Sequence, residues 1–87
     1  MELFAGVDIG STTSKCVLID ENKDVKVFYH DYTEFDRDLS GEKVLNAALE
    51  EIGAKLEDVK YIVATGYGRK AFQRANMDIP EIIAHGV

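Results

Sequence analysis

The sequence is poor in cysteine, proline and basic residues, and it contains no tryptophan. It has one cysteine and one proline in 87 residues, and its 10 Lys and Arg against 16 Asp and Glu give a formal net charge of −6. A single cysteine cannot form an internal disulfide, which is typical of a reducing compartment. The negative charge disfavours binding to DNA, RNA or anionic lipid, because that binding depends on clustered Lys and Arg.

Long hydrophobic runs are also missing. No apolar stretch approaches the ~20 residues that cross a bilayer, and the N-terminal MELFAGVDIG has no basic region before its apolar part, unlike a signal peptide. We therefore expect a cytoplasmic protein that does not contact membranes. The composition, 46% hydrophobic and 30% charged, predicts a globular chain. Its length fits a single domain with a modest core.

Three short segments rich in β-branched and aromatic residues predict strands at residues 3–9, 15–20 and 25–32. The connections GSTTS and ENKD are short enough for an antiparallel three-stranded meander. Apolar residues occur on both faces of the first strand. This pattern predicts a sheet covered on both sides, by helices or by another domain.

A stripe of apolar residues at helical spacing predicts a helix from about Ser40 to Ile52. The stripe consists of Leu45, Ala48, Leu49 and Ile52. Ser40 is the expected N-cap, with Glu42 in the first turn, and Gly53 suits the left-handed C-cap position.

The rest of the chain predicts a return to the sheet. VKYIVAT (59–65) is expected to be a fully buried strand, followed by GYGR, a short helix over RKAFQRA and a final apolar segment, IPEIIAHGV. Pro80 places that last segment at a strand start or a sheet edge. The predicted order β-β-β-α-β-α-β indicates an α/β fold and is the order of the first half-lobe in actin-like ATPases and sugar kinases.

The turn DIGSTTSK (8–15) combines the residue types of a phosphate-binding loop. Gly10 allows close approach of a ligand to backbone amides, which can form an anion-binding nest. Ser11, Thr12, Thr13 and Ser14 add hydroxyl donors, and Lys15 supplies a positive charge for a terminal phosphate. Asp8 can hold a hydrated Mg²⁺, which usually keeps several waters and takes one or two carboxylates.

A simpler interpretation of this turn remains open. Gly, Ser, Thr and Asp are also the ordinary residues of hairpin turns. The segment is not a Walker A loop, because the GxxxxGK[ST] spacing is missing and a strand, rather than a helix, follows.

A second glycine loop, TGYGRKA (65–71), follows a predicted strand and opens a predicted helix. Gly66, Gly68 and Ala71 match the GxGxxA fingerprint of dinucleotide-binding proteins. The acidic residue expected about 20 positions further on is missing, since Asp78 and Glu81 come too early. The alternative is a tight strand-to-helix turn with Arg69 at the surface.

The remaining chemically active residues do not form a recognisable site. His30 and His85 have no partner at metal-ligand spacing, so we expect no zinc site. Cys16 lies within a strand pattern and is expected to be a small buried hydrophobic residue. The acidic stretch 33–38 is expected to be a solvated connector.

In combination, GVDIGSTTSKCVLID, VATGYGR and EIIAHG resemble the activator ATPases of 2-hydroxyacyl-CoA dehydratases and benzoyl-CoA reductases. These ATPases belong to the superfamily of acetate and sugar kinases, heat-shock chaperones and actin. The resemblance implies a ribonuclease H-like half-lobe, in which a meander is followed by a helix and parallel strands. It also implies a homodimeric cytoplasmic ATPase with a four-iron, four-sulfur cluster between its subunits, which delivers a low-potential electron to the dehydratase or reductase.

The resemblance assigns roles to residues in both loops. Asp8 corresponds to the acidic residue near Mg²⁺ and the attacking water, and Gly10 to the tight turn. The ATP phosphate contacts correspond to Ser11, Thr12, Thr13, Ser14 and Lys15. Gly66, Gly68 and Arg69 belong to the TGYGR segment that the family shares, and the resemblance implies that they also contribute to cofactor binding.

The chain also departs from this family. A two-lobed member is about three times as long, and this sequence ends before the second phosphate motif, the adenosine pocket and the cluster cysteines; Cys16 matches none of these cysteines. We therefore expect residues 1–87 to be a single partial domain, the N-terminal part of the lobe. Alone, it is expected to bind ATP weakly or not at all and to have no measurable turnover.

Two other functions remain open. The chain could belong to another kinase of the same superfamily, which would share the first phosphate loop. It could also be a non-catalytic module that self-associates through uncovered apolar faces or its edge strand.

Overall fold

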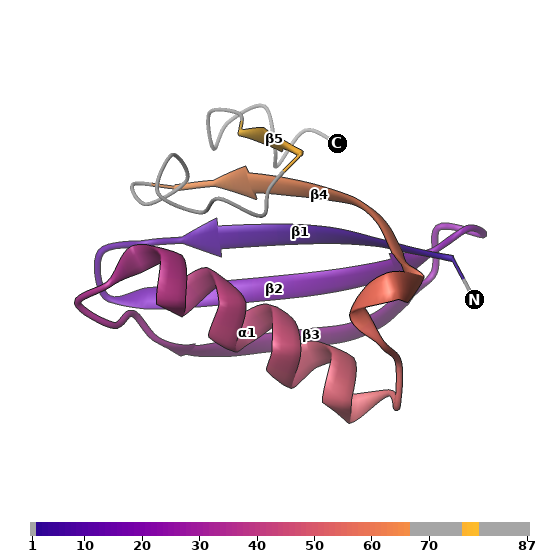
Figure 1. Cartoon of the computed structure of the whole chain (residues 1–87), viewed down its shortest axis with the longest axis horizontal. Coiled ribbons are helices and arrows are strands. Elements are labelled where there is room, and N and C mark those ends of the chain that lie inside the picture. Colours follow the sequence, from indigo (N-terminus) through magenta and orange to yellow (C-terminus); the bar gives the residue numbers. More distant parts are fainter. Residues whose placement is uncertain (1, 67–75, 79–87) are drawn as a thin grey trace.

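The computed structural model describes residues 2–66 and 76–78. These residues form a mixed sheet in the order β3-β2-β1-β4-β5, with one α-helix across one of its faces (Figure 1). The elements are β1 (Leu3–Ile9), β2 (Thr13–Asp20), β3 (Val25–Tyr32), α1 (Arg37–Glu51), the short 3-10 helix η1 (Leu56–Asp58), β4 (Val59–Thr65) and β5 (Met77–Asp78). The predicted helix over RKAFQRA and the segment IPEIIAHGV lie outside the described residues.

The predicted meander is confirmed. β1 pairs with β2, and β2 with β3, in antiparallel register. Cys16 of β2 lies between Val7 of β1 and Tyr29 of β3, so the alternating side chains of three strands share one face. β2 begins at Thr13, two residues before the predicted start, because Thr13 and Ser14 pair with the end of β3.

Helix α1 connects the meander to β4, which pairs with β1 in parallel and then with β5. This confirms the predicted crossover into a parallel strand. The prediction that β4 is fully buried is wrong: Ile62, Ala64 and Thr65 are buried, whereas Lys60 and Tyr61 are exposed. In the described part of the chain a helix covers only one face of the sheet, so residues of β4 on the other face keep contact with solvent.

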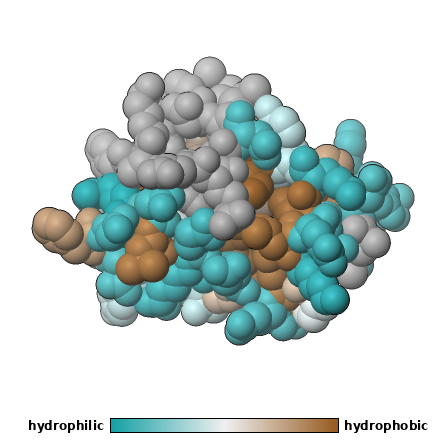
Figure 2. All heavy atoms as spheres, in the orientation of Figure 1, coloured by the Kyte–Doolittle hydropathy of each residue, from teal (hydrophilic) through white to brown (hydrophobic). Residues whose placement is uncertain are grey.

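The hydrophobic core lies between α1 and the sheet. α1 packs against β1, β2 and β3. The core consists of Leu3, Ala5, Val7, Ile9, Cys16, Leu18, Val44, Leu45, Ala48, Leu49, Ile62 and Ala64. Figure 2 shows this side of the molecule, where an area of hydrophobic residues in the right half is bordered by hydrophilic residues.

Helix α1 begins three residues before the predicted start, and its N-cap is Asp36 rather than Ser40. The Asp36 carboxylate accepts hydrogen bonds from the amides of Asp38 (3.0 Å) and Leu39 (3.2 Å). Ser40 is buried in the first turn, where its hydroxyl accepts from the amide of Glu34 (2.6 Å). Asp and Ser cap helices about equally well, and burial directs Ser40 to a different backbone partner.

The predicted helix end is confirmed. Gly53 has a φ of +68°, in the left-handed region. Its amide donates to the carbonyl of Glu50 (3.2 Å), and the amide of Ala54 donates to the carbonyl of Leu49 (3.0 Å). These two hydrogen bonds are a Schellman motif, which satisfies carbonyls that the helix leaves unpaired.

Candidate phosphate-binding site

The carboxyl ends of the parallel strands β1 and β4 meet at one edge of the sheet, the place where open α/β sheets bind ligands. Asp8, near the end of β1, is the register partner of Lys15 on β2 and of Thr65 on β4. Because side chains alternate along a strand, these three residues lie on the face opposite α1. Asp8 is partly buried and Lys15 is exposed.

Thr65 carries a buried hydroxyl beside Asp8. The residue is 6% exposed, and within the described ranges 2–66 and 76–78 its hydroxyl oxygen has no hydrogen-bond partner. Leaving a buried polar group unpaired costs about 1–3 kcal/mol. The hydroxyl is therefore available to a bound group. Thr65 was not predicted as a site residue, although it is the first residue of the TGYGR segment, because its loss of solvent contact depends on how the strands pair.

Gly66 brings the two predicted glycine loops together. Its φ is +89°, and a Cβ atom built on it would lie 2.5 Å from Asp8 Oδ1 and 2.6 Å from the carbonyl oxygen of Ile9. Only glycine allows β4 to end this close to the end of β1. Gly68 and Arg69, which were predicted to contribute to the same site, lie outside the described residues.

The turn between β1 and β2 is closed at Gly10. The Gly10 amide donates to the carbonyl of Thr13 (3.1 Å), and a Cβ atom on Gly10 would lie 2.8 Å from that carbonyl oxygen. Ser11 and Thr12 at the tip are exposed, and Thr13 is partly buried. The turn therefore presents two hydroxyl residues to solvent next to Lys15.

Ser14 differs from the other hydroxyl residues of this turn. It is 0% exposed, it lies on the face covered by α1, and its hydroxyl is hydrogen-bonded to that of Thr33 at 2.8 Å. Thr33 in turn donates from its hydroxyl to the carbonyl of Gly10 (2.8 Å) and from its amide to the carbonyl of Thr12 (2.8 Å). A phosphate contact from the Ser14 side chain stays a prediction, and its hydroxyl already has a protein partner.

Two acidic residues and one lysine connect α1 to the end of β3. Lys43 on α1 lies 2.9 Å from Glu34 and 3.4 Å from Asp31. The amide of Tyr32, and then Lys43, lower the pKa of Asp31 from its usual value, against the opposing effect of partial burial. These contacts hold the residues that follow β3 against the helix.

Cys16 is buried under α1, and burial raises the pKa of its thiol to about 12. The thiol is therefore neutral, which confirms that Cys16 is a small buried hydrophobic residue. Within the described residues, no group of three or more His, Cys, Asp or Glu side chains is arranged to hold a metal ion.

The chain belongs to the BadF/BadG/BcrA/BcrD ATPase family, whose sequence model matches residues 5–86. The activator of lactoyl-CoA dehydratase from Anaerotignum propionicum is 40% identical over 81 residues, which are 92% of this chain and 30% of that protein. The 2-hydroxyisocaproyl-CoA dehydratase activator from Clostridioides difficile is 34% identical over 80 residues, 92% of this chain and 30% of that protein.

Solved structures of such activators have the same fold. The activator of 2-hydroxyisocaproyl-CoA dehydratase from Clostridium difficile, with bound ADPNP, superposes with a TM-score of 0.84 at 32% identity, over 95% of this chain and 31% of that one. Component A of the Acidaminococcus fermentans (R)-2-hydroxyglutaryl-CoA dehydratase gives 0.86 at 27% identity, over 98% and 33%. These likenesses confirm the predicted α/β, actin-like ATPase fold. The chain spans about a third of the length of these proteins.

In the described part of the chain, neither α1 nor any other helix is both long and apolar enough to cross a bilayer.

Proposed function

We propose that this chain is the phosphate-binding part of an ATPase that activates a 2-hydroxyacyl-CoA dehydratase or a benzoyl-CoA reductase by ATP-driven electron transfer. The observation that carries the proposal is the placement of Asp8 between Lys15 and Thr65, next to two glycines that keep the backbone close. The names and the bound ADPNP of the related activators support it. We further propose that residues 1–87 are one partial domain, the N-terminal part of the ATPase lobe.

The described residues fit a nucleotide phosphate with Mg²⁺. Asp8 would hold the ion through water, since Mg²⁺ is usually bound through one or two carboxylates and several waters. Beside Asp8 lies the Thr65 hydroxyl, which has no hydrogen-bond partner among the described residues. Lys15 and the exposed hydroxyls of Ser11 and Thr12 would contact phosphate oxygens. When bound, Mg²⁺ supplies charge neutralisation. The chain supplies orientation, through the closely paired ends of β1 and β4.

The residues of this chain do not fit an iron–sulfur cluster. Cluster ligands are thiolates, whereas Cys16 is neutral and enclosed between α1 and the sheet. We therefore propose an iron–sulfur cluster, a homo-oligomer and a cytoplasmic location only for a longer protein of this family. The residues of this chain take no part in holding a cluster.

The isolated chain is expected to bind nucleotide weakly, because small-molecule sites usually bury 70–90% of the ligand and this chain holds one wall of such a site. We expect a Kd for Mg·ATP of about 1 mM or weaker, which corresponds to about −4 kcal/mol, and no measurable ATP hydrolysis. Calorimetry that gave a low-micromolar Kd would contradict this expectation.

Two lysine variants test the proposal. Lys15 and Lys60 are both exposed, but Lys60 lies at the start of β4, at the opposite end of the sheet from the turn. We expect Lys15→Met to weaken binding of Mg·AMP-PNP about tenfold, because a charge-assisted hydrogen bond is lost. Lys60→Met, with the same change in net charge, should bind like the unmodified chain. Phosphorus NMR line broadening measures the nucleotide affinity of both variants. Equal losses of affinity in the two variants would show that only the net charge of the chain matters.

A second candidate function is self-association. On the sheet face opposite α1, Phe4, Phe28 and Tyr61 are 41%, 59% and 39% exposed. Phe4 and Tyr61 are register partners on neighbouring strands, and neighbouring exposed aromatic side chains are typical of an interaction surface. It is compatible with the first proposal, because the same face could be covered by another part of a longer protein.

A further inference from the structure

Thr33 lies outside the predicted phosphate loop, but it is hydrogen-bonded to three residues of that loop. Thr33 follows β3, and Figure 1 shows that this end of β3, the β1–β2 turn and the start of α1 lie at the same end of the molecule. We propose that Thr33 is a positioning residue for the phosphate loop, residues 10–14, and holds it in the shape that receives a nucleotide phosphate. This inference rests on the proposed function.

Three contacts of Thr33 reach three positions of the loop. Its hydroxyl donates to the Gly10 carbonyl, its amide donates to the Thr12 carbonyl, and its hydroxyl oxygen is 2.8 Å from the hydroxyl of Ser14. A hydroxyl has one proton, so the Ser14 hydroxyl is the donor in its contact with Thr33. The side chain of Thr33 thus ties the first and last residues of the loop together, on the side away from Lys15.

The hydroxyl–hydroxyl contact is enclosed. Ser14 is fully buried, and the Thr33 residue is partly buried. Removing the Thr33 hydroxyl would leave the Ser14 hydroxyl and the Gly10 carbonyl without this partner. Because a buried polar group without a partner is costly, the loop would be expected to move in order to reach water or another partner.

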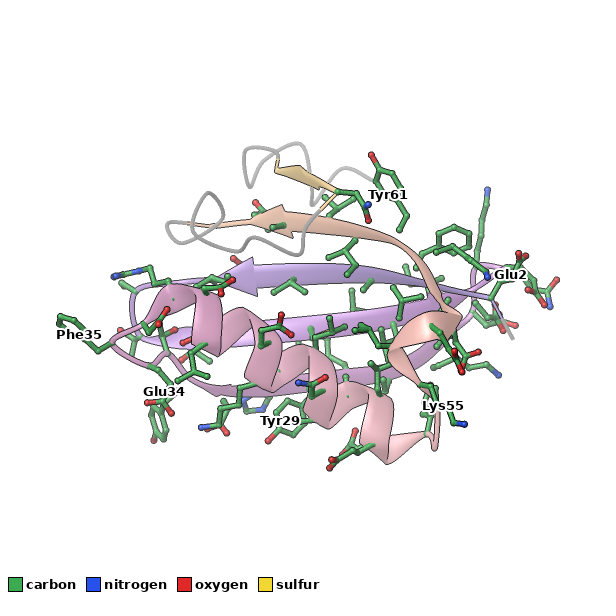
Figure 3. The ribbon with its side chains drawn as sticks, in the orientation of Figure 1. Glu2, Tyr29, Glu34, Phe35, Lys55 and Tyr61 are labelled. Carbon is green, nitrogen blue, oxygen red and sulfur yellow. The ribbon has the colours of Figure 1, made fainter. Side chains whose placement is uncertain are left out.

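Helix α1 in turn fixes the segment that holds Thr33. The amide of Glu34 donates to the hydroxyl of Ser40 (2.6 Å), and this hydroxyl donates to the carbonyl of Asp36 (3.2 Å). The Glu34 carboxylate lies 2.9 Å from Lys43; Figure 3 shows Glu34 at the end of the molecule where α1 begins. The shape of the phosphate loop therefore depends on the first two turns of α1 as well as on its own sequence.

Two substitutions at Thr33 test this proposal in the 87-residue chain. Thr33→Val removes the hydroxyl and keeps the shape, whereas Thr33→Ser keeps the hydroxyl. Without nucleotide, we expect Thr33→Val to raise the hydrogen-exchange rate of the Gly10 amide about tenfold. With Mg·AMP-PNP as the probe, we expect it to weaken binding by a similar factor. Thr33→Ser should stay within about threefold of the unmodified chain in both measurements.

A core variant separates positioning from general stability. Leu49→Ala opens a cavity under the last turn of α1, at the end of the helix away from the loop, and lowers the melting temperature. Measured well below its melting temperature, it should keep the nucleotide affinity of the unmodified chain. If Thr33→Val lowered only the melting temperature and left both loop exchange and affinity unchanged, the role of Thr33 would be structural and the inference would be overturned.

A double variant provides an independent check. Ser14→Ala in the Thr33→Val background removes the hydroxyl that the single change leaves unpaired, so part of the lost affinity should return. Purely additive losses would contradict a coupled pair. If Mg·AMP-PNP bound the unmodified chain away from residues 8–15 while loop exchange still rose in Thr33→Val, the proposed function would fail but the support of the loop by Thr33 would stand. If Mg·AMP-PNP bound at residues 8–15 but Thr33→Val left loop exchange unchanged, the proposed function would stand and the positioning role of Thr33 would fail.

Discussion

Gly66 is the residue on which the contact between the two glycine loops depends. Replacing it with alanine places a methyl group against Asp8 Oδ1 and the Ile9 carbonyl, at a φ that side chains rarely adopt. We expect Gly66→Ala to destabilise the chain by about 1–3 kcal/mol and to weaken Mg·AMP-PNP binding. Urea unfolding and phosphorus NMR measure the two effects.

The control for Gly66 is Gly53, which also has a positive φ but whose added Cβ would meet no atom within 4 Å. Gly53→Ala should destabilise by about 1 kcal/mol through the backbone alone and leave nucleotide binding unchanged. If Gly66→Ala behaved in the same way, the loop contact would have no part in binding. Loss of NAD binding in Gly66→Ala would instead favour the dinucleotide-binding interpretation.

Asp20 illustrates how a buried carboxylate makes stability depend on pH. It is 8% exposed and accepts hydrogen bonds from the amides of Asp24 (3.0 Å) and Asn22 (2.9 Å), with Lys26 at 3.6 Å. The pKa of Asp20 is lowered from its usual value, mainly by the hydrogen bond from the Asp24 amide. The Asn22 amide and Lys26 lower this pKa further, whereas burial raises it. A lowered folded-state pKa stabilises the fold above the unfolded-state pKa of about 4, and this contribution is lost as pH falls further.

We therefore expect Asp20→Asn to lower the free energy of unfolding at pH 7, with the difference from the unmodified chain shrinking as pH falls below about 4. Urea unfolding at several pH values measures it. Asp24→Asn is the control, because Asp24 takes part in this turn through its backbone. A difference that stayed constant with pH would contradict a role for the Asp20 charge.

At the scale of elements, the sequence predicted the first four strands in their order, but it did not predict β5 and it placed the helix start too late. Apolar periodicity identifies the buried middle of α1, whereas the first turn contains Asp36 and Ser40, either of which could cap it. Tertiary structure decides between them: Ser40 is buried and bonded to Glu34, so the exposed Asp36 caps the helix.

Thr33 was overlooked for a similar reason. It occurs within an acidic stretch, and its hydrogen-bond partners Gly10 and Ser14 are 23 and 19 positions away in the sequence.

The reassigned cap can be tested directly. Asp36→Ala removes both side-chain hydrogen bonds to α1 and should lower stability by about 1 kcal/mol. Asp36→Asn should lose much less, because asparagine caps helices nearly as well. Thermal unfolding of the two variants is sufficient, and equal losses would show that the negative charge, rather than the cap, is what matters.

At the scale of the molecule, the sheet has one face covered by α1 and one face with exposed aromatic residues. The sequence predicted apolar residues on both faces, but it did not show which face the helix would occupy, because that depends on the crossover. We expect the chain to associate as its concentration rises, and Phe28→Lys to reduce this association. Sedimentation velocity at several concentrations measures it; a monomer at all concentrations would contradict the self-association proposal.

The central claim is that the turn between β1 and β2, together with Asp8 and Gly66, binds a nucleotide's phosphates. The most direct test is a map of amide chemical shifts during titration with Mg·AMP-PNP, which detects even millimolar binding. We expect the largest shifts at residues 8–15 and at Gly66, and we expect these shifts to be lost in Asp8→Asn. Shifts centred elsewhere on the sheet, or shifts unchanged in Asp8→Asn, would contradict it.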